Sequence, residues 1–157
     1  IILEIKRSNM KRYFKIIDEY KNNNISIPKR QTKFSAGYDF EAATDILLNP
    51  MEITMIPTGV AAKFPSNEVL LIFPRSSLAI KKKLVLVNGV GVIDSDYFKS
   101  DNQGHIMFPV LNYSKEIVEI KKGERVMQGI FLKFKKVSQE ILSNNLRTGG
   151  FGSSDKN

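Results

Sequence analysis

Residues 73–77 hold the first set of side chains that could do chemistry, because an apolar stretch there ends in an arginine and two hydroxyl residues. The guanidinium fork of Arg75 matches phosphate oxygens, and the hydroxyls of Ser76 and Ser77 with the free N–H groups of a helix start would add donors. These residues are candidates for a phosphate cradle. The alternative is that Ser76 only caps a helical turn and Arg75 pairs with a surface carboxylate.

Residues 88–97 bring an amide, two glycines and an acid into one short segment. Gly89 and Gly91 would let the backbone approach a ligand closely. Asp94 follows an apolar pair, and a carboxylate whose neighbours exclude bulk water can accept a proton from an attacking water. Tyr97 is near enough in sequence to border the same pocket. The segment is also typical of a hairpin with an aspartate-rich turn.

Two further segments have less distinctive residue types. Residues 36–39 place Asp39 after a glycine, where it could be a buried, hydrogen-bonded structural acid. Residues 122–125 indicate a turn into a strand that carries Gln128. Each segment, taken alone, is as readily scaffold as site.

Turn-forming residues recur at short intervals along the chain, which predicts many short strands. We expect an all-β fold, a distorted jelly-roll or β-sandwich of short antiparallel strands with one short helix. The helix is expected over residues 76–82, with Ser76 or Ser77 at its N-cap. The clearest strand candidates are Glu52 to Ile56, Glu68 to Phe73, Leu84 to Asn88, His105 to Leu111 and Arg125 to Phe134.

The length of 157 residues predicts one domain, which we place at residues 10–138. Residues 1–9 are expected to be an upstream extension, with Met10 as the natural start. Residues 139–157 are rich in glycine and serine and have few core-forming side chains. We expect them to form a flexible C-terminal arm that can close over a ligand.

Composition restricts the classes of function. The chain has no cysteine and a single histidine, which argues against thiolate zinc sites, and no apolar run is long enough to span a bilayer. We therefore expect a cytoplasmic protein without a membrane anchor. The formal net charge of +8 favours phosphorylated partners. Its lysine clusters at 81–83 and 133–136 are either solvated faces or steer an anionic ligand.

Taken together and in order, the segments around Asp39, Arg75, Asp94, Gln128 and Phe151 resemble the five motifs of the trimeric dUTP nucleotidohydrolases, the dUTPases. The resemblance implies a β jelly-roll homotrimer whose active sites are shared between subunits. Such an enzyme cleaves dUTP to dUMP and pyrophosphate by water attack on the α-phosphate, with Mg²⁺ as cofactor. This activity would limit uracil incorporation into DNA and supply dUMP for thymidylate synthesis.

The resemblance assigns catalysis to Asp94, Asp39 and Arg75. Asp94 would orient the attacking water as a base, Asp39 would organise the surrounding network, and Arg75 would stabilise transition-state charge. Mg²⁺ would be held by the triphosphate and water, without a direct protein ligand. Further phosphate contacts would come from Ser76, Ser77, Gln128, Arg147, Ser153 and Ser154.

The resemblance also assigns recognition of the base and the sugar. Asn88 and main-chain groups near Val92 would read the uracil edge, in a pocket too tight for a thymine methyl. Tyr97 would underlie the deoxyribose and exclude a 2′-hydroxyl. Phe151 would stack over the uracil when the arm closes.

The chain departs from the family pattern between Tyr97 and Gly104, where six residues replace the usual one. We expect residues 98–103 to form a hairpin-tip insertion beside the sugar pocket, which is either a tolerated loop or a contact surface for a protein partner. The arm is also one residue shorter than usual before Gly149.

Three alternatives are considered. Residues 76–79 also resemble dCTP deaminases, but those enzymes need a glutamate in the strand after Gly104, and residues 105–110 contain no acid. A regulatory protein could keep the nucleotide pocket and switch a partner when the arm closes. A nucleic-acid-binding module is suggested only by the net charge, and no specific nucleic acid is expected as a partner.

Overall fold

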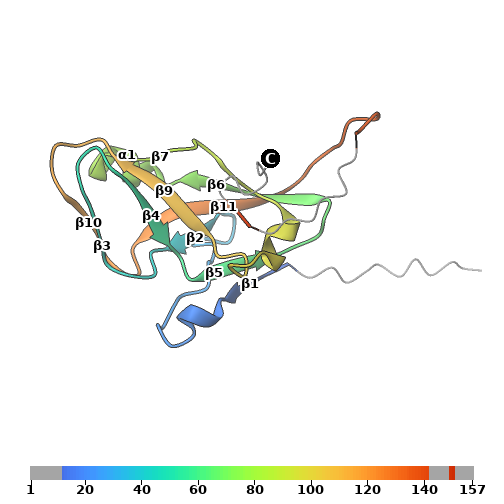
Figure 1. Cartoon of the computed structure of the whole chain (residues 1–157), viewed down its shortest axis with the longest axis horizontal. Helices are drawn as coiled ribbons and strands as arrows, with labels where there is room; N and C mark the ends of the chain where they lie inside the picture. Colours follow the sequence, from blue (N-terminus) through green and yellow to red (C-terminus); the bar gives the residue numbers. More distant parts are fainter. Residues whose placement is uncertain (1–11, 142–148, 151–157) are drawn as a thin grey trace, which may run out of the picture.

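The computed structural model describes residues 12–141 and 149–150. Within these ranges the chain forms eleven β-strands, one α-helix and two 3₁₀ helices, and every strand pair is antiparallel. No helix in this part of the chain is long and apolar enough to cross a membrane. The predicted all-β fold with one short helix is confirmed (Figure 1).

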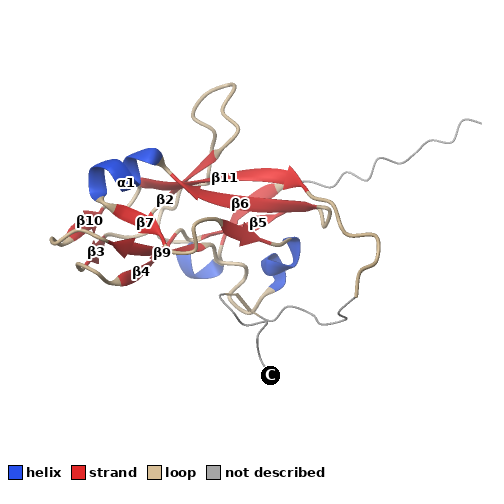
Figure 2. Ribbon diagram, turned by 90° about the horizontal axis from the view of Figure 1, so that it is seen from above, coloured by secondary structure: helices blue, strands red, loops and turns tan. Residues whose placement is uncertain are grey.

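Two main sheets form layers, with β11 and β6 of one sheet lying above β7, β9 and β4 of the other (Figure 2). The first sheet has the order β2 (Tyr38–Glu41), β11 (Arg125–Lys133), β6 (Glu68–Pro74), β8 (Gly91–Ile93). The second has the order β4 (Ile53–Pro57), β9 (Met107–Asn112), β7 (Leu84–Leu86).

Two smaller strand pairs complete the sandwich, β1 (Tyr13–Ile16) with β5 (Val60–Lys63) and β10 (Val118–Ile120) with β3 (Ile46–Leu48). Helix α1 (Ser76–Lys82) and the 3₁₀ helix η2 (Ser95–Lys99) each connect the first main sheet to the second, and the 3₁₀ helix η1 (Asp18–Tyr20) connects β1 to β2.

Alternating burial along the strands creates the core. In β6 and β9 every second side chain is buried, as expected for strands with one face toward the interior. Phe40 is fully buried at the centre, and its ring meets those of Phe14 and Phe108 edge-on at centroid distances of 5.5 and 5.7 Å. Gly129 leaves room for this ring, since a Cβ there would lie 2.8 Å from Phe40 Cε2.

The outward face of the second sheet is apolar as well. Ile53 is 60% exposed and Met55 is 38% exposed, although both lie in strand β4 and are paired with residues of β9. The register of β4, β9 and β7 places only apolar side chains in these outward rows: Ile53, Met55, Pro57, Met107, Pro109, Leu111 and Val85. A sheet that is apolar on both faces is typical of one that a further layer covers.

The structure confirms the predicted helix and the predicted strand segments, with ends that shift by at most two residues. Two predictions are wrong. Neither Ser76 nor Ser77 occupies the N-cap of α1; Arg75 does, and its side chain makes no capping hydrogen bond to the helix. Residues 98–103 are not a hairpin tip, because they connect β8 to β9 and these strands belong to different sheets.

His105 joins three parts of the fold beneath η1. Its side chain is 6% exposed, its Nε2 accepts the Gly59 N–H at 3.0 Å, and its ring lies 5.2 Å from that of Tyr20. An accepting Nε2 requires the neutral imidazole. Burial accordingly lowers the pKa of His105 below its ordinary value.

Replacing Phe40 with Ala should lower the free energy of unfolding by about 3–5 kcal/mol, because the change leaves a cavity that its neighbours cannot fill. Urea denaturation at fixed protein concentration measures the loss. Phe34→Ala is the matched control, since this ring is 89% exposed and its removal should cost less than about 0.5 kcal/mol. Equal losses in the two variants would contradict the assignment of the core.

His105 should make stability depend on pH below about 6.5. The unfolded chain takes up the proton at the ordinary pKa and the folded chain only at a lower one, so stability is lost as the pH falls through this window. We expect the unfolding free energy of the wild type, measured relative to His105→Gln, to decrease between pH 7.5 and pH 5. A pH-independent difference would show that the folded state accepts the proton without penalty.

Candidate active site

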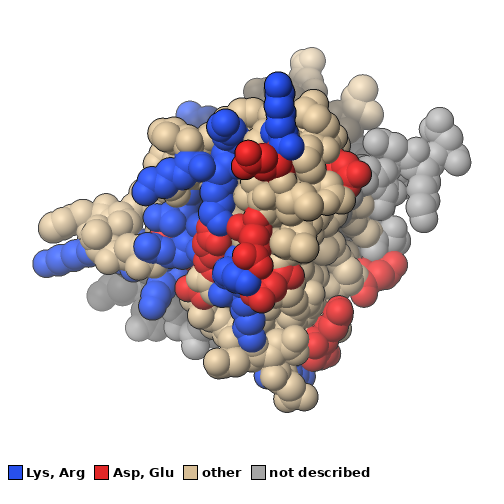
Figure 3. Space-filling model, turned by 90° about the vertical axis from the view of Figure 1, so that its left-hand side faces the viewer, with Lys and Arg blue, Asp and Glu red and all other residues tan. Residues whose placement is uncertain are grey.

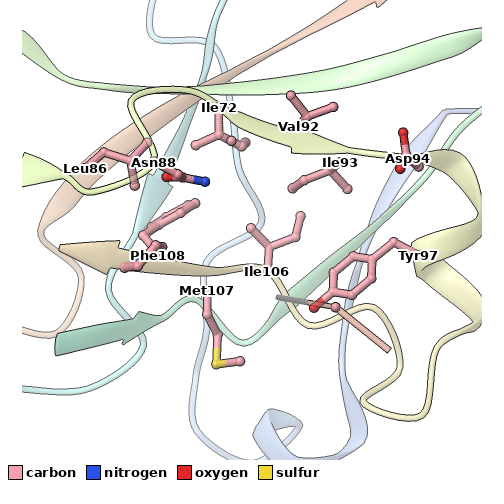
Figure 4. Close-up of a pocket in the computed structure, with 13 residues that line it drawn as sticks. Ile72, Leu86, Asn88, Val92, Ile93, Asp94, Tyr97, Ile106, Met107 and Phe108 are labelled. Atoms are coloured by element: carbon pink, nitrogen blue, oxygen red, sulfur yellow. The ribbon is translucent and has the colours of Figure 1, made fainter. Parts of the chain in front are cut away.

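Three of the residues expected to bind the base and sugar, Asn88, Val92 and Tyr97, line one recess of about 260 Å³ between β8 and β9. Asn88 and Asp94 flank β8, and Tyr97 lies below Asp94 (Figure 4). Apolar side chains of β6 and β9, among them Ile72 and Phe108, form the floor. The structure therefore places Asn88, Val92, Asp94 and Tyr97 around one recess. All four come from the short segment 88–97.

Asn88 is positioned by a tight turn after β7. Gly89 has a φ of +72°, and its N–H donates to Leu86 O at 3.0 Å. Gly91 opens β8 directly against Ile72, since a Cβ at position 91 would lie 3.1 Å from the Ile72 Cβ. This close approach holds the 88–91 turn at the rim of the recess. It also makes backbone groups near Val92 available to a ligand.

Asp94 stands where β8 ends and η2 begins. Its backbone is extended, and its carbonyl accepts the Tyr97 N–H at 3.1 Å. In a chain taken alone, Asp94 is exposed and the Val92 side chain is 64% exposed. The water-excluding environment expected for Asp94 is therefore not provided by the described residues of one chain.

Tyr97 is the most constrained of these side chains. It is 7% exposed, and its hydroxyl donates to His105 O at 2.7 Å and accepts from Asn102 Nδ2 at 2.8 Å. Gly150 of the C-terminal arm lies against the ring, where a Cβ would come within 2.7 Å of Tyr97 Cε2. The ring thus contributes to the recess and contacts the arm of its own chain.

A second group of predicted residues lies around Asp39, which is 11% exposed. Asp39 Oδ1 is 3.6 Å from Arg75 Nε, and Asp39 Oδ2 is 3.3 Å from Arg125 Nη1. Arg75 Nη1 also donates to Arg125 O at 3.4 Å. Asp39 therefore holds two guanidinium groups side by side, as expected for a structural acid that organises a cationic site.

Gln128 and Ser76 share this second recess with Asp39 and Arg75. Gln128 is paired with Asp39 across the β11–β2 ladder. Its side chain lies close to the backbone of Gly37, where a Cβ would come within 2.8 Å of Gln128 Oε1. Ser77 instead lines a neighbouring recess with Arg75 and lysines of α1. Lysine and arginine side chains gather on this face, with acidic side chains among them (Figure 3).

In the described part of the chain the two groups line separate recesses that have no lining residue in common. Strand β6 contributes Ile72 to the first and leads directly to Arg75 in the second. The resemblance implied that all these residues belong to active sites shared between subunits. In the described part of one chain they fall into two groups, one in each recess.

Some site residues had no role in the sequence interpretation, and others lie outside the described residues. Arg125 was placed at the start of a strand without a function, and only its pairing with Asp39 reveals one. Asn102 was part of an insertion with no assigned chemistry. The predictions for four residues of the arm fall outside the described residues: Arg147, Phe151, Ser153 and Ser154.

Comparison with known proteins shows the family of this chain. The model of the dUTPase family matches residues 23–155. A deoxyuridine 5′-triphosphate nucleotidohydrolase of Lactococcus lactis is 49% identical over 144 residues, covering 90% of this chain and 96% of that protein. One from Finegoldia magna is 42% identical over 84% of this chain and 92% of that protein. The crystal structure of the dUTPase from Streptococcus mutans has a TM-score of 0.77 and 41% identity, covering 81% of this chain and 99% of that one. The chain belongs to the dUTPase family.

Proposed function

We propose that this chain hydrolyses dUTP to dUMP and pyrophosphate by attack of water on the α-phosphate. One observation carries the proposal: family membership coincides with a recess that groups Asn88, Asp94 and Tyr97, and with a cationic recess built on Asp39. In a cell this reaction would limit uracil incorporation into DNA and supply dUMP for thymidylate synthesis.

Uracil would be read at the rim of the first recess. The Asn88 amide offers both a donor and acceptors, and the backbone near Val92 adds main-chain groups. Gly91 packs directly on Ile72, which leaves little space for the extra methyl of thymine. A base that leaves a buried polar group unpaired would lose about 1–3 kcal/mol per group.

The deoxyribose would lie on the Tyr97 ring, whose fixed position would exclude a 2′-hydroxyl. The arm would then close over the nucleotide, with Phe151 over the uracil and Arg147, Ser153 and Ser154 on the phosphates. Support for closure comes from Gly150, which already lies against Tyr97. Closure would exclude water from the reacting groups.

Asp94 would accept the proton of the attacking water. Arg75, Ser76, Ser77 and Gln128 would bind the phosphates, and the pairing of Arg75 with Asp39 orients the guanidinium before substrate arrives. Donors that are fixed in advance stabilise transition-state charge without reorganising.

Mg²⁺ is the cofactor that we propose. Among the described residues there is no group of three or more His, Cys, Asp or Glu side chains that could hold a metal. As the family resemblance implies, the triphosphate oxygens and water would be its ligands, and when bound it would neutralise part of the phosphate charge.

A homotrimer with shared sites would unite the two recesses. The outward apolar rows of β4, β9 and β7 supply a surface for another subunit, and Met107 and Pro109 belong both to these rows and to the first recess. A neighbour seated there would border Asp94 and could bring its own Arg75 recess to it. It would also shield Asp94 from bulk water.

A protein partner for residues 98–103 is not part of this proposal. Phe98 packs edge-on against Tyr13 with a centroid distance of 6.1 Å, and Gln103 Oε1 accepts the Asp18 N–H at 3.2 Å. These contacts, like those of Asn102, lie within the same chain. The segment therefore has an internal role that does not require a partner.

Wild-type protein should release pyrophosphate from dUTP and far less from dTTP, dCTP or UTP. Asp94→Asn should reduce this release by roughly 10²–10⁴-fold, because it removes the base, while binding of a non-hydrolysable dUTP analogue persists. A coupled pyrophosphate assay and calorimetry measure the two properties. Near wild-type turnover in Asp94→Asn would remove Asp94 from the mechanism.

Shared sites can be tested by subunit complementation. Asp94→Asn and Arg75→Gln subunits should each be inactive alone, but co-assembled trimers should regain about a quarter of wild-type turnover, because random assortment joins the two intact halves at that frequency. Mixing two preparations of the same variant is the control. If hybrids stay inactive while light scattering confirms trimers, both halves must come from one chain.

A further inference from the structure

We infer that Asn102, in the turn between η2 and β9, is a positioning residue that holds the Tyr97 ring and thereby sets discrimination against ribonucleotides. The inference rests on the proposed function, because it concerns the sugar that this site accepts. It assigns a role to the segment in which the chain departs from its family pattern.

The orientation of the Asn102 amide follows from its neighbours. Its Oδ1 lies 2.6 Å from Ser100 Oγ and 3.2 Å from the Gly104 N, both of which can donate a hydrogen bond. The other end of the amide, Nδ2, lies 2.8 Å from the Tyr97 hydroxyl oxygen. With donors at Oδ1, the Nδ2 hydrogens are directed to Tyr97.

The Tyr97 hydroxyl oxygen can accept a hydrogen bond from Asn102 Nδ2. Its own proton goes to the carbonyl oxygen of His105, 2.7 Å away, which can only accept. A lone pair of the hydroxyl is then available to the Asn102 amide. The two bonds hold the far end of the ring from two sides, so the ring cannot swing about its Cα–Cβ bond without breaking one of them.

The turn that carries Asn102 is itself held in place. Gly104 has a φ of +73°, and a Cβ there would come within 2.7 Å of Phe98 Cα, so the turn packs directly on the backbone of η2. Ser100 is 5% exposed. On the outer side Lys63 Nζ lies 5.6 Å from the Phe98 ring centroid, and Gln103 bonds to η1. Asn102 is therefore supported from β5, η1 and η2.

A fixed ring matters because exclusion by shape depends on small distances. A single 2′-hydroxyl is sterically excluded only if the side chain beneath the sugar does not move away. Gly150 lies against the same ring: a Cβ added to Gly150 would be 2.7 Å from Tyr97 Cε2. The position of the ring therefore also limits how closely Gly150 can approach. Without the hydrogen bond from Asn102, the Tyr97 ring could move and make room for the 2′-hydroxyl of a ribose.

The test is the ratio of kcat/KM for dUTP to kcat/KM for UTP, measured by pyrophosphate release. Asn102→Ala should lower this ratio roughly fivefold, the effect of one lost hydrogen bond, and mainly by raising turnover of UTP. Asp101→Ala is the matched control in the same turn, because this side chain is exposed, and it should leave the ratio unchanged.

A double-mutant cycle with Tyr97→Phe separates positioning from general stability. If Asn102 acts through the Tyr97 hydroxyl, Asn102→Ala should have no further effect on the ratio in the Tyr97→Phe background. Additive effects, or an unchanged ratio in Asn102→Ala, would overturn the inference. Should Asn102→Ala not fold, Tyr97→Phe decides by itself, since an unchanged ratio there removes the hydroxyl from discrimination. A wild-type protein that does not hydrolyse dUTP would instead defeat the proposed function.

Discussion

Close backbone approach on both sides of Ile72 is the constraint on which the rest of the structure depends. In strand β6, Ile72 is paired with Gly91 of β8 on one side and with Gly129 of β11 on the other. A Cβ on Gly91 would lie 3.1 Å from Ile72 Cβ, and one on Gly129 would lie 3.0 Å from Ile72 Cδ1. The two glycines allow three strands to pack around one branched side chain. Both recesses depend on this register, because β8 leads to Asp94 and β6 leads to Arg75.

Polar groups near the site are held by partners, which explains their fixed positions. Among the described residues no buried side-chain nitrogen or oxygen lacks a hydrogen-bond partner. Asn112, outside the site, is an example: its Nδ2 donates to Leu48 O and Glu116 O, and its Oδ1 accepts the Ser114 N–H. Buried polar networks that are fully satisfied restrict side chains to one arrangement. Tyr97 and Asp39 gain their orientation in this way.

Association of subunits would explain two features together: the separation of the two recesses and the outward apolar rows of β4 and β9. In the described part of a single chain, Ile53, Met55 and Asp94 are exposed to solvent. Association of subunits through that face would bury apolar area and enclose the carboxylate at once. Stability and chemistry would then depend on the same interface.

The all-β class and the position of helix α1 could be predicted from the sequence, because strand alternation, turn residues and capping signals are local properties of the chain. The spacing of the motifs predicted the family and proposed the site residues. Tertiary structure alone decided the partners that lie far apart in sequence. Arg125 joins Asp39 only because β11 pairs with β2, and His105 reaches Gly59 only across the fold. Residues 98–103 were read as a hairpin tip, since local pattern does not reveal that β8 and β9 belong to different sheets. Contacts between distant segments depend on how the sheets pack, and neither turn chemistry nor periodicity encodes that packing.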